Sequence, residues 1–72
     1  MSKRATLELR KMIGQNVAWW IKFRRMENKD LAEKMGVQPS QISQIISGDR
    51  VTLYEMQRVA KHLDIKIIDL FR

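Results

Sequence analysis

The stretch that decides the fold is NKDLAEKMGVQPSQISQIISGDR, residues 28–50. Counted from Asn28, the small residue Ala32 is fifth and Gly36 is ninth. Two helices that cross closely need a small side chain at the crossing, and a sharp turn between them needs a glycine. The spacing therefore predicts two short helices, joined at Gly36 and packed as one rigid unit.

Apolar residues supply the contacts between these two helices. They fall at positions 4, 8, 10, 15 and 18 of the stretch and are Leu31, Met35, Val37, Ile42 and Ile45. Proline is favoured at the first position of a helix, where Pro39 stands, and Gly48 is placed to end the second helix. Together these residues predict a helix-turn-helix over about residues 28–47.

The middle of this motif carries no charge. Residues 35–48, here called the neutral window, contain no acidic or basic residue, although the chain has 14 Lys and Arg and a net charge of +6. So basic a balance in a small domain indicates a polyanionic partner, most simply nucleic acid. Composition alone leaves open a merely solvated basic surface and an anionic membrane.

Size and composition limit the class of protein. The 72 residues, 44% of them hydrophobic, predict a single globular domain over residues 1–72. The lack of cysteine excludes disulfides and Cys-ligated zinc and fits a cytoplasmic location, and there is no apolar run long enough for a membrane span. His62 stands alone, and Asp64 and Asp69 form no acid/base pair, so we expect no metal, no cofactor and no enzymatic activity.

The N-terminal third predicts a helix from about Thr6 to Arg25, with a wide apolar arc. Its inward stripe, at helical spacing, comprises Leu9, Ile13, Val17 and Trp20. A second line beside the stripe predicts either core or a dimer or partner surface and comprises Met12, Trp19 and Phe23.

The C-terminal third predicts a helix that begins at Thr52, where Thr52 and Glu55 match a reciprocal capping box. Its inward residues are Leu53, Met56, Val59, Ala60 and Leu63, and Asp64 is its stop. Residues 65–71 fit either a short fifth helix or a strand that pairs with a second copy. The helix is favoured, because it completes an all-α fold, a small bundle of about five helices.

Residues 13–71, with NKDLAEKMGVQPSQISQIISGDR and VTLYEMQRVAKHLDIKIIDLF at their centre, resemble the phage repressor and Cro-like family, also called XRE-type helix-turn-helix regulators. The resemblance implies a lambda repressor-like domain of five short helices that binds operator DNA, usually as a dimer. The chain departs from the family at Ile21, where Arg is common, and at Ile46, where Glu is common.

With this resemblance, the chain is expected to be a sequence-specific, double-stranded-DNA-binding transcription regulator. We expect a repressor that binds a palindromic operator as a homodimer, with its third helix in the major groove and half-sites about 34 Å apart. One alternative is an antitoxin-type regulator that also binds a protein partner. Another is a sequence-neutral packaging or RNA-binding module, against which the neutral window argues, because such proteins gain affinity from cations on the contact face.

The candidate base readers lie in the third helix, except Gln38, which lies just before it. Ile42 defines its inward direction, so Ser40 and Gln44 point away from the core. Hydroxyl and amide groups match the donors and acceptors of base edges in the major groove. The predicted base-reading residues are Gln38, Ser40, Gln41, Ser43 and Gln44, of which Ser43 is also a candidate for a phosphate contact.

Phosphate contacts are expected from groups around the neutral window. Asn28 and Lys29 open the second helix, whose N-terminal amides suit an anion. Ser47 and Arg50 follow the third helix. Lys3 and Arg4 belong to a flexible basic arm, expected over residues 1–5.

Overall fold

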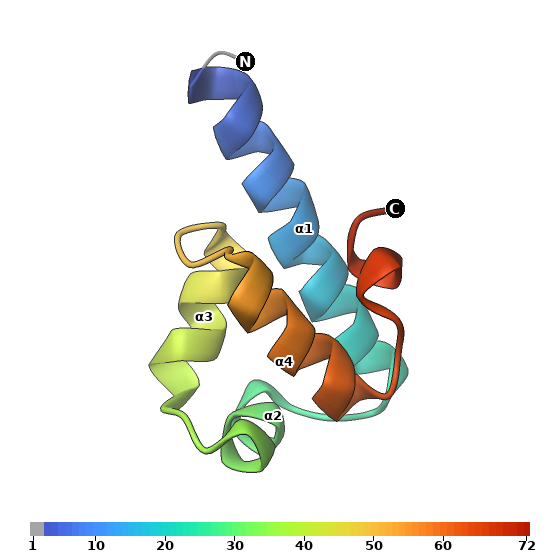
Figure 1. The fold of residues 1–72 in the computed structure, drawn as a ribbon. Helices are drawn as coiled ribbons and strands as arrows, with labels where there is room; N and C mark the ends of the chain where they lie inside the picture. The colour runs from blue at the N-terminus through green and yellow to red at the C-terminus, as the bar shows by residue number, and fades with distance from the viewer. Residues whose placement is uncertain (1–2) are drawn as a thin grey trace.

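A computed structural model describes residues 3–72, with side chains from Thr6 onward. Its elements are α1 (Lys3–Phe23), α2 (Asn28–Met35), α3 (Pro39–Ser47), α4 (Leu53–Leu63) and the 3-10 helix η1 (Ile67–Leu70), shown in Figure 1. There is no strand in this part of the chain. The all-α prediction is confirmed, whereas the count of about five helices is slightly too high. The fifth element is a four-residue 3-10 turn, and the strand alternative is wrong.

The C-terminal segment is held by side chains of α1 that donate to its backbone carbonyls. Asn16 Nδ2 donates to the carbonyl oxygens of Leu70 and Arg72, both at 2.9 Å. One turn further along α1, Trp20 Nε1 donates to the Asp69 carbonyl at 3.3 Å. These three bonds give backbone carbonyls of the segment partners on α1 and so hold the segment against that helix.

Arg24, at the next turn of α1, also donates hydrogen bonds to backbone carbonyls. Arg24 Nε donates to the Leu63 carbonyl at 2.9 Å, and a terminal guanidinium nitrogen donates to the Asp64 carbonyl at 3.0 Å. Carbonyls at the end of a helix have no partner inside the helix. Arg24 therefore ties the end of α4 to α1. Asp64 has φ of 56°, and so ends α4 in the left-handed conformation expected of it.

The core is a single cluster between α1 and the other elements. Its buried residues are Ile13, Val17, Ile21, Leu31, Ala32, Met35, Ile42, Ile45, Met56, Val59, Ala60, Leu63 and Leu70. On α1 the buried stripe is completed by Ile21, while Trp20 is half-buried beside it.

Two residues predicted to face the core do not. Leu9 is 43% exposed, because the N-terminal turns of α1 project beyond the other helices (Figure 1). Leu53 occupies the first position of α4 and is 65% exposed, so burial on that helix begins further along. Helical spacing places both residues near the core side of their helices, but no element packs over them.

The helix ends follow the local signals in the sequence. Gly36 has φ of 71° and ends α2, and Val37 N–H closes the turn on the Ala32 carbonyl at 3.0 Å. A left-handed residue at this position favours glycine. At the start of α4, Thr52 Oγ1 accepts a hydrogen bond from Glu55 N–H at 3.1 Å, which is one half of the predicted capping box.

The N-terminal boundary of α1 differs from the prediction. The helix begins at Lys3 rather than near Thr6, and it ends at Phe23 rather than near Arg25. The arm expected over residues 1–5 lies outside the described residues, except for the helical backbone of residues 3–5.

Gly14 permits the closest approach between two helices. It is buried on α1, directly against the C-terminal end of α3. A methyl group placed on Gly14 would lie 2.5 Å from the Ile45 carbonyl oxygen and still closer to that of Ile46. Backbone atoms cannot move aside as a flexible side chain can. The approach of α1 to α3 therefore requires that residue 14 have no side chain.

Gly14→Ala should destabilise the protein by about 1–3 kcal/mol, as overpacking of a close helix contact does. The sign is informative, because at an unpacked helix position the same change should stabilise by about 1 kcal/mol. The free energy of unfolding from urea denaturation measures the effect. Gln15→Ala, at the neighbouring exposed position, is the control and should leave stability nearly unchanged. An equal or higher stability of Gly14→Ala would contradict the close approach.

Candidate nucleic-acid interface

The rotation of α3 about its axis is fixed by two isoleucines. The helix packs against α1 and α2 and leaves its other side open (Figure 1). Ile42 and Ile45 are fully buried on the packed side. Since successive residues turn by about 100° around a helix, the residues opposite Ile42 point outward. Ser40 and Gln44 are exposed accordingly.

Ser40 and Gln44 are available to an outside partner. Within residues 3–72, neither side chain makes a hydrogen bond to the rest of the chain. The hydroxyl and the amide each carry both a donor and an acceptor. The open face of α3 therefore presents hydrogen-bonding groups without charge, one turn apart along the helix.

Gln38 and Gln41 are partly engaged in the start of the helix. The Gln38 backbone N–H donates to Gln41 Oε1 at 3.2 Å, within a reciprocal capping arrangement across the first turn. Gln38 is exposed and Gln41 is half-buried. The side-chain oxygen of Gln41 serves the cap, whereas its NH2 group takes no part in this bond. This pair therefore organises the N-terminal end of α3.

The two other serines of α3 donate within the helix. Ser43 Oγ lies 3.4 Å from the Pro39 carbonyl oxygen. Ser47 Oγ lies 2.9 Å from the Gln44 carbonyl and 3.1 Å from Asp49 Oδ2. The Asp49 carboxylate beside Ser47 opposes an approaching phosphate, so Ser47 is less favourably placed for an anion than its position along the chain implied.

An acidic residue adjoins the N-terminus of α2. Asn28 and Lys29 are both exposed there, as a phosphate contact requires. Lys29 Nζ, however, lies 3.2 Å from Glu27 Oε2, and the hydrogen bond to the Glu27 carboxylate raises the pKa of Lys29 above its ordinary value. Both side chains are largely exposed, so this ion pair contributes little to stability. Glu27 and Asp30 cap the helix, with Glu27 N–H donating to Asp30 Oδ2 at 2.8 Å.

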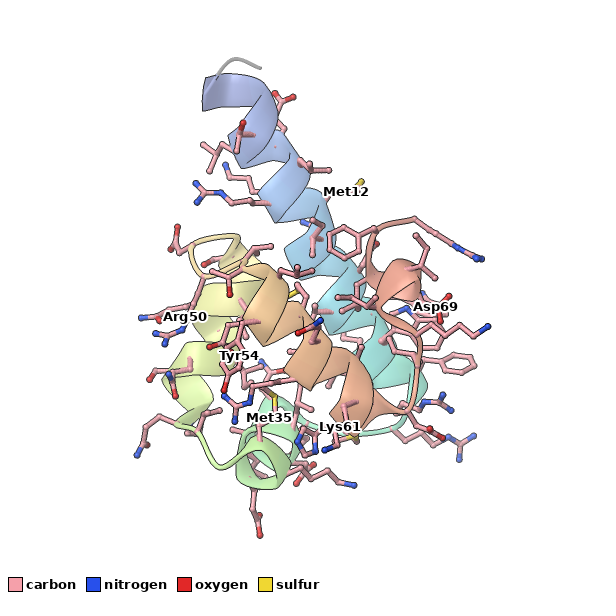
Figure 2. All side chains as sticks on the ribbon, viewed as in Figure 1. Met12, Met35, Arg50, Tyr54, Lys61 and Asp69 are labelled. Carbon is pink, nitrogen blue, oxygen red and sulfur yellow. The ribbon has the colours of Figure 1, made fainter. Side chains whose placement is uncertain are left out.

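Arg50 lies beside α3, after its C-terminus. Figure 2 shows it on the side of the molecule opposite Met12 and Asp69. Its Nε lies 3.8 Å from Glu55 Oε1, while the side chain keeps 43% of its surface exposed. The Glu55 carboxylate is mostly buried, and the ion pair holds the Arg50 guanidinium near the start of α4. A cation held in this position can meet a phosphate that flanks a ligand of α3.

Sequence reasoning missed a residue that fixes the turn between the two helices. Arg58 on α4 donates to the Met35 carbonyl at 2.6 Å, at the end of α2. Its guanidinium also lies 5.6 Å from the ring centre of Tyr54. Figure 2 shows Met35 and Tyr54 on the same side of α4. No local sequence pattern predicts this contact, because it joins residues that are distant in the sequence.

The residues predicted as a dimer or partner surface are all exposed. Met12, Trp19 and Phe23 expose 39%, 56% and 57% of their surface. Trp19 and Phe23 stack with their ring centres 5.0 Å apart and their planes at 13°. Their other sequence-based interpretation, as core, is therefore wrong. Lys3 and Arg4 have no described side chains, so their predicted contacts lie outside the described residues.

Two further findings concern metals and membranes. Within residues 3–72, no three His, Asp or Glu side chains gather where they could hold a metal ion. No helix in the same part of the chain is long and apolar enough to cross a membrane.

Comparison with known proteins agrees with this geometry. A family model described as helix-turn-helix matches residues 23–70, which include α2, α3 and α4. Among solved structures, the chain is similar to the restriction-modification controller protein C.AhdI from Aeromonas hydrophila. That similarity has a TM-score of 0.79 and 28% sequence identity, and it covers 89% of this chain and 97% of that chain. A search of curated proteins gave no match.

Gln41 and Gln44 should respond differently to truncation. Gln41→Ala removes the acceptor of the α3 cap and should lower the free energy of unfolding by about 0.5–1 kcal/mol. Gln44→Ala removes no contact within the chain and should change stability by less than about 0.5 kcal/mol. Thermal or urea unfolding measures both. Equal losses for the two variants would mean that Gln41 does not cap α3.

Proposed function

We propose that this chain, which belongs to the XRE-type helix-turn-helix family of DNA-binding transcription regulators, is a repressor. Its α3 reads bases in the major groove of a palindromic operator. It binds this operator as a homodimer. The observation that carries the proposal is the open face of α3, where Ser40 and Gln44 are exposed, uncharged and without a hydrogen-bond partner among residues 6–72.

The uncharged face favours base reading over binding by charge alone. A protein that only neutralises phosphates gains affinity from every cation on its contact face. Base edges instead require paired donors and acceptors, which Gln provides to adenine and Ser to several bases. Gln38 and Gln41, at the start of α3, join this set, and Ser43 lies at its margin.

Phosphates on either side of the groove are held by groups around α3. Asn28 and Lys29 approach one strand from the N-terminus of α2, where backbone N–H groups favour an anion. Arg50 approaches from the other end of α3. Ser47 lies beside it as a weaker contact, because the Asp49 carboxylate opposes a phosphate there. Lys3 and Arg4 extend the basic surface at the N-terminus. These contacts set the register of α3 without reading the sequence.

Repression follows from occupancy. A homodimer on a palindromic site places two copies of α3 in successive turns of the major groove, about 34 Å apart. A protein bound across a promoter in this way excludes the polymerase and needs no further activity. An antitoxin-type regulator would bind a protein partner in addition, and purification of the native protein with a stoichiometric companion would favour that alternative.

A second candidate role comes from the similarity to the restriction-modification controller protein C.AhdI. The two chains match over nearly the whole length of that protein, at 28% identity. Control of a restriction-modification gene pair is a specific case of the same DNA-binding activity. If this role is correct, restriction and modification genes lie next to the gene of this chain, and the chain binds a duplex taken from upstream of them. The absence of such genes would exclude this role.

Selection from a random pool of duplexes tests the proposed function. The enriched duplex is then compared with a scrambled one of equal composition over a range of salt concentrations. We expect tighter binding to the enriched duplex at every salt concentration, with similar salt slopes for both. Equal affinity for the two duplexes would instead identify a sequence-neutral nucleic-acid-binding module.

Gln44→Ala should weaken binding to the enriched duplex by about 1–3 kcal/mol and relax the preference at one base pair. The physical reason is the loss of a paired donor and acceptor at a base edge. Fluorescence anisotropy with single-base variants of the duplex measures both effects. Gln57→Ala, an exposed glutamine on α4, is the control. A uniform loss on all duplexes would remove Gln44 from the base readers.

Arg50→Ala should weaken binding to enriched and scrambled duplexes alike and reduce the salt slope by roughly one unit, because one phosphate contact is lost. Lys61→Ala removes the same charge from the exposed side of α4 and should alter the slope less. Titrations at several salt concentrations give the slopes. A loss limited to the enriched duplex would mean that Arg50 reads a base.

A further inference from the structure

The positive charge of the chain is concentrated outside the helix-turn-helix. Residues 23–70, which the family model matches, contain eight basic and seven acidic residues, a net charge of +1. Residues 1–12 contain four basic residues and one acidic residue, a net charge of +3, which is half of the +6 of the whole chain. Because attraction for a polyanion depends on the local density of cations, we expect the strongest attraction for DNA at the start of α1.

The start of α1 lies next to the turn that follows α3. Figure 1 shows the first turns of α1 projecting past that turn, beyond the other helices. A Cβ atom added to Gly48 would lie 3.1 Å from the backbone nitrogen of Lys11 and 3.2 Å from its Cγ. Lys11 therefore packs against the turn, and Arg50 stands two residues after Gly48 in it. A duplex that reaches Arg50 from the open face of α3 comes next to Lys11.

Arg10 carries a guanidinium that the chain leaves without a partner. It precedes Ile13 and Gly14 by three and four residues, so it lies on the side of α1 that packs on the rest of the domain. Arg10 keeps part of its surface exposed, but its Nε is buried without a hydrogen-bond partner. An unpaired buried polar atom is unfavourable, and a guanidinium does not lose its charge. An anion bound at the exposed part of Arg10 would compensate that charge.

Acidic residues nearby do not neutralise this region. Among residues 6–72, no ion pair joins Arg10 or Lys11 to a carboxylate. Glu8 lies two residues before Arg10, about 160° around α1 from it. The Asp49 carboxylate is hydrogen-bonded at the end of α3, and Glu55 is mostly buried and paired with the turn. Arg10 and Lys11 therefore keep their charge for an anion from outside the chain.

The length of this segment suits the backbone of a duplex. Residues 3–11 span roughly 12 Å at 1.5 Å per residue. One strand of DNA carries a phosphate about every 3.4 Å along the axis, so a segment of this length passes several phosphates. Its position beside the open face of α3 favours the backbone of the same duplex over a separate anionic partner.

We propose that the start of α1, residues 3–11, is a second DNA-contacting element, in which Arg10 and Lys11 bind phosphates beyond the C-terminal end of α3. Both residues lie outside the part of the chain that the family model matches. The inference rests on the proposed function for the binding of a duplex, but not for the reading of bases. In this arrangement α3 supplies the specificity, whereas α1 supplies much of the electrostatic affinity.

Salt titrations of a double variant, Arg10→Gln with Lys11→Gln, test the inference. The loss of two phosphate contacts should reduce the salt slope by about 2 and weaken binding roughly 10-fold or more at about 0.1 M salt, on enriched and scrambled duplexes alike. The control, Lys61→Gln with Lys66→Gln, removes the same charge from exposed positions on α4 and after it. It should reduce the slope by less than about 0.5.

Further variants separate a phosphate contact from a structural role. Arg10→Lys with Lys11→Arg keeps both charges and should restore the wild-type slope, which a purely structural role of Arg10 would not allow. Lys11→Gln alone, at an exposed position, should reduce the slope by about 1 and keeps the inference testable if Arg10→Gln impairs folding. Urea unfolding should give the wild-type midpoint for each variant, because neither side chain has a hydrogen-bond or ion-pair partner among residues 6–72.

The outcomes distinguish this inference from the proposed function. A folded Arg10→Gln and Lys11→Gln variant with the same slope as the control would overturn the inference, even if the wild-type chain prefers the enriched duplex. Equal wild-type affinity for the two duplexes, together with a slope reduced by about 2 in the double variant, would support the inference and reject base reading by α3.

Discussion

The contact between the backbone of α1 at Gly14 and the C-terminal carbonyls of α3 is the constraint on which the structure depends. Because no side chain separates the two helices there, α3 lies directly against α1. Gly48, at the end of α3, also lies near the backbone of Lys11, where an added Cβ would be 3.1 Å from the amide nitrogen, so the same end is fixed at two points. With its C-terminus fixed and Ile42 buried, α3 can present only its opposite face to a ligand.

The neutral window follows from that arrangement. Isoleucines occupy the packed side of α3, and hydroxyls and amides occupy the open side, so neither side carries a charge. Ile21 and Ile46 are two further uncharged residues near α3, and they line one groove between α1, α2 and α3. The family commonly has Arg and Glu at these two positions. Replacing both with apolar residues leaves no unpaired charge, whereas replacing only one would leave a poorly solvated ion.

Much of the fold was predictable because its signals are local. The turn at Gly36 and the cap at Thr52 each depend on a few neighbouring residues, and both are present. Contacts between distant residues carried no such signal. Gly14 looked like any glycine in a helix, and the bond of Arg58 to the end of α2 joins α4 to the turn. For the candidate site, burial of Ile42 fixed which side chains of α3 face outward, but not that Gln41 caps the helix.

The central claim is that the open face of α3, rather than the surrounding cations alone, recognises DNA. An NMR titration of the labelled protein with its selected duplex measures this residue by residue. The account predicts the largest shifts in the backbone amides of residues 38–44 and in the side-chain NH2 of Gln44, with these shifts much reduced on a scrambled duplex. Shifts confined to Lys29, Arg50 and other basic residues, and equal on both duplexes, would contradict it.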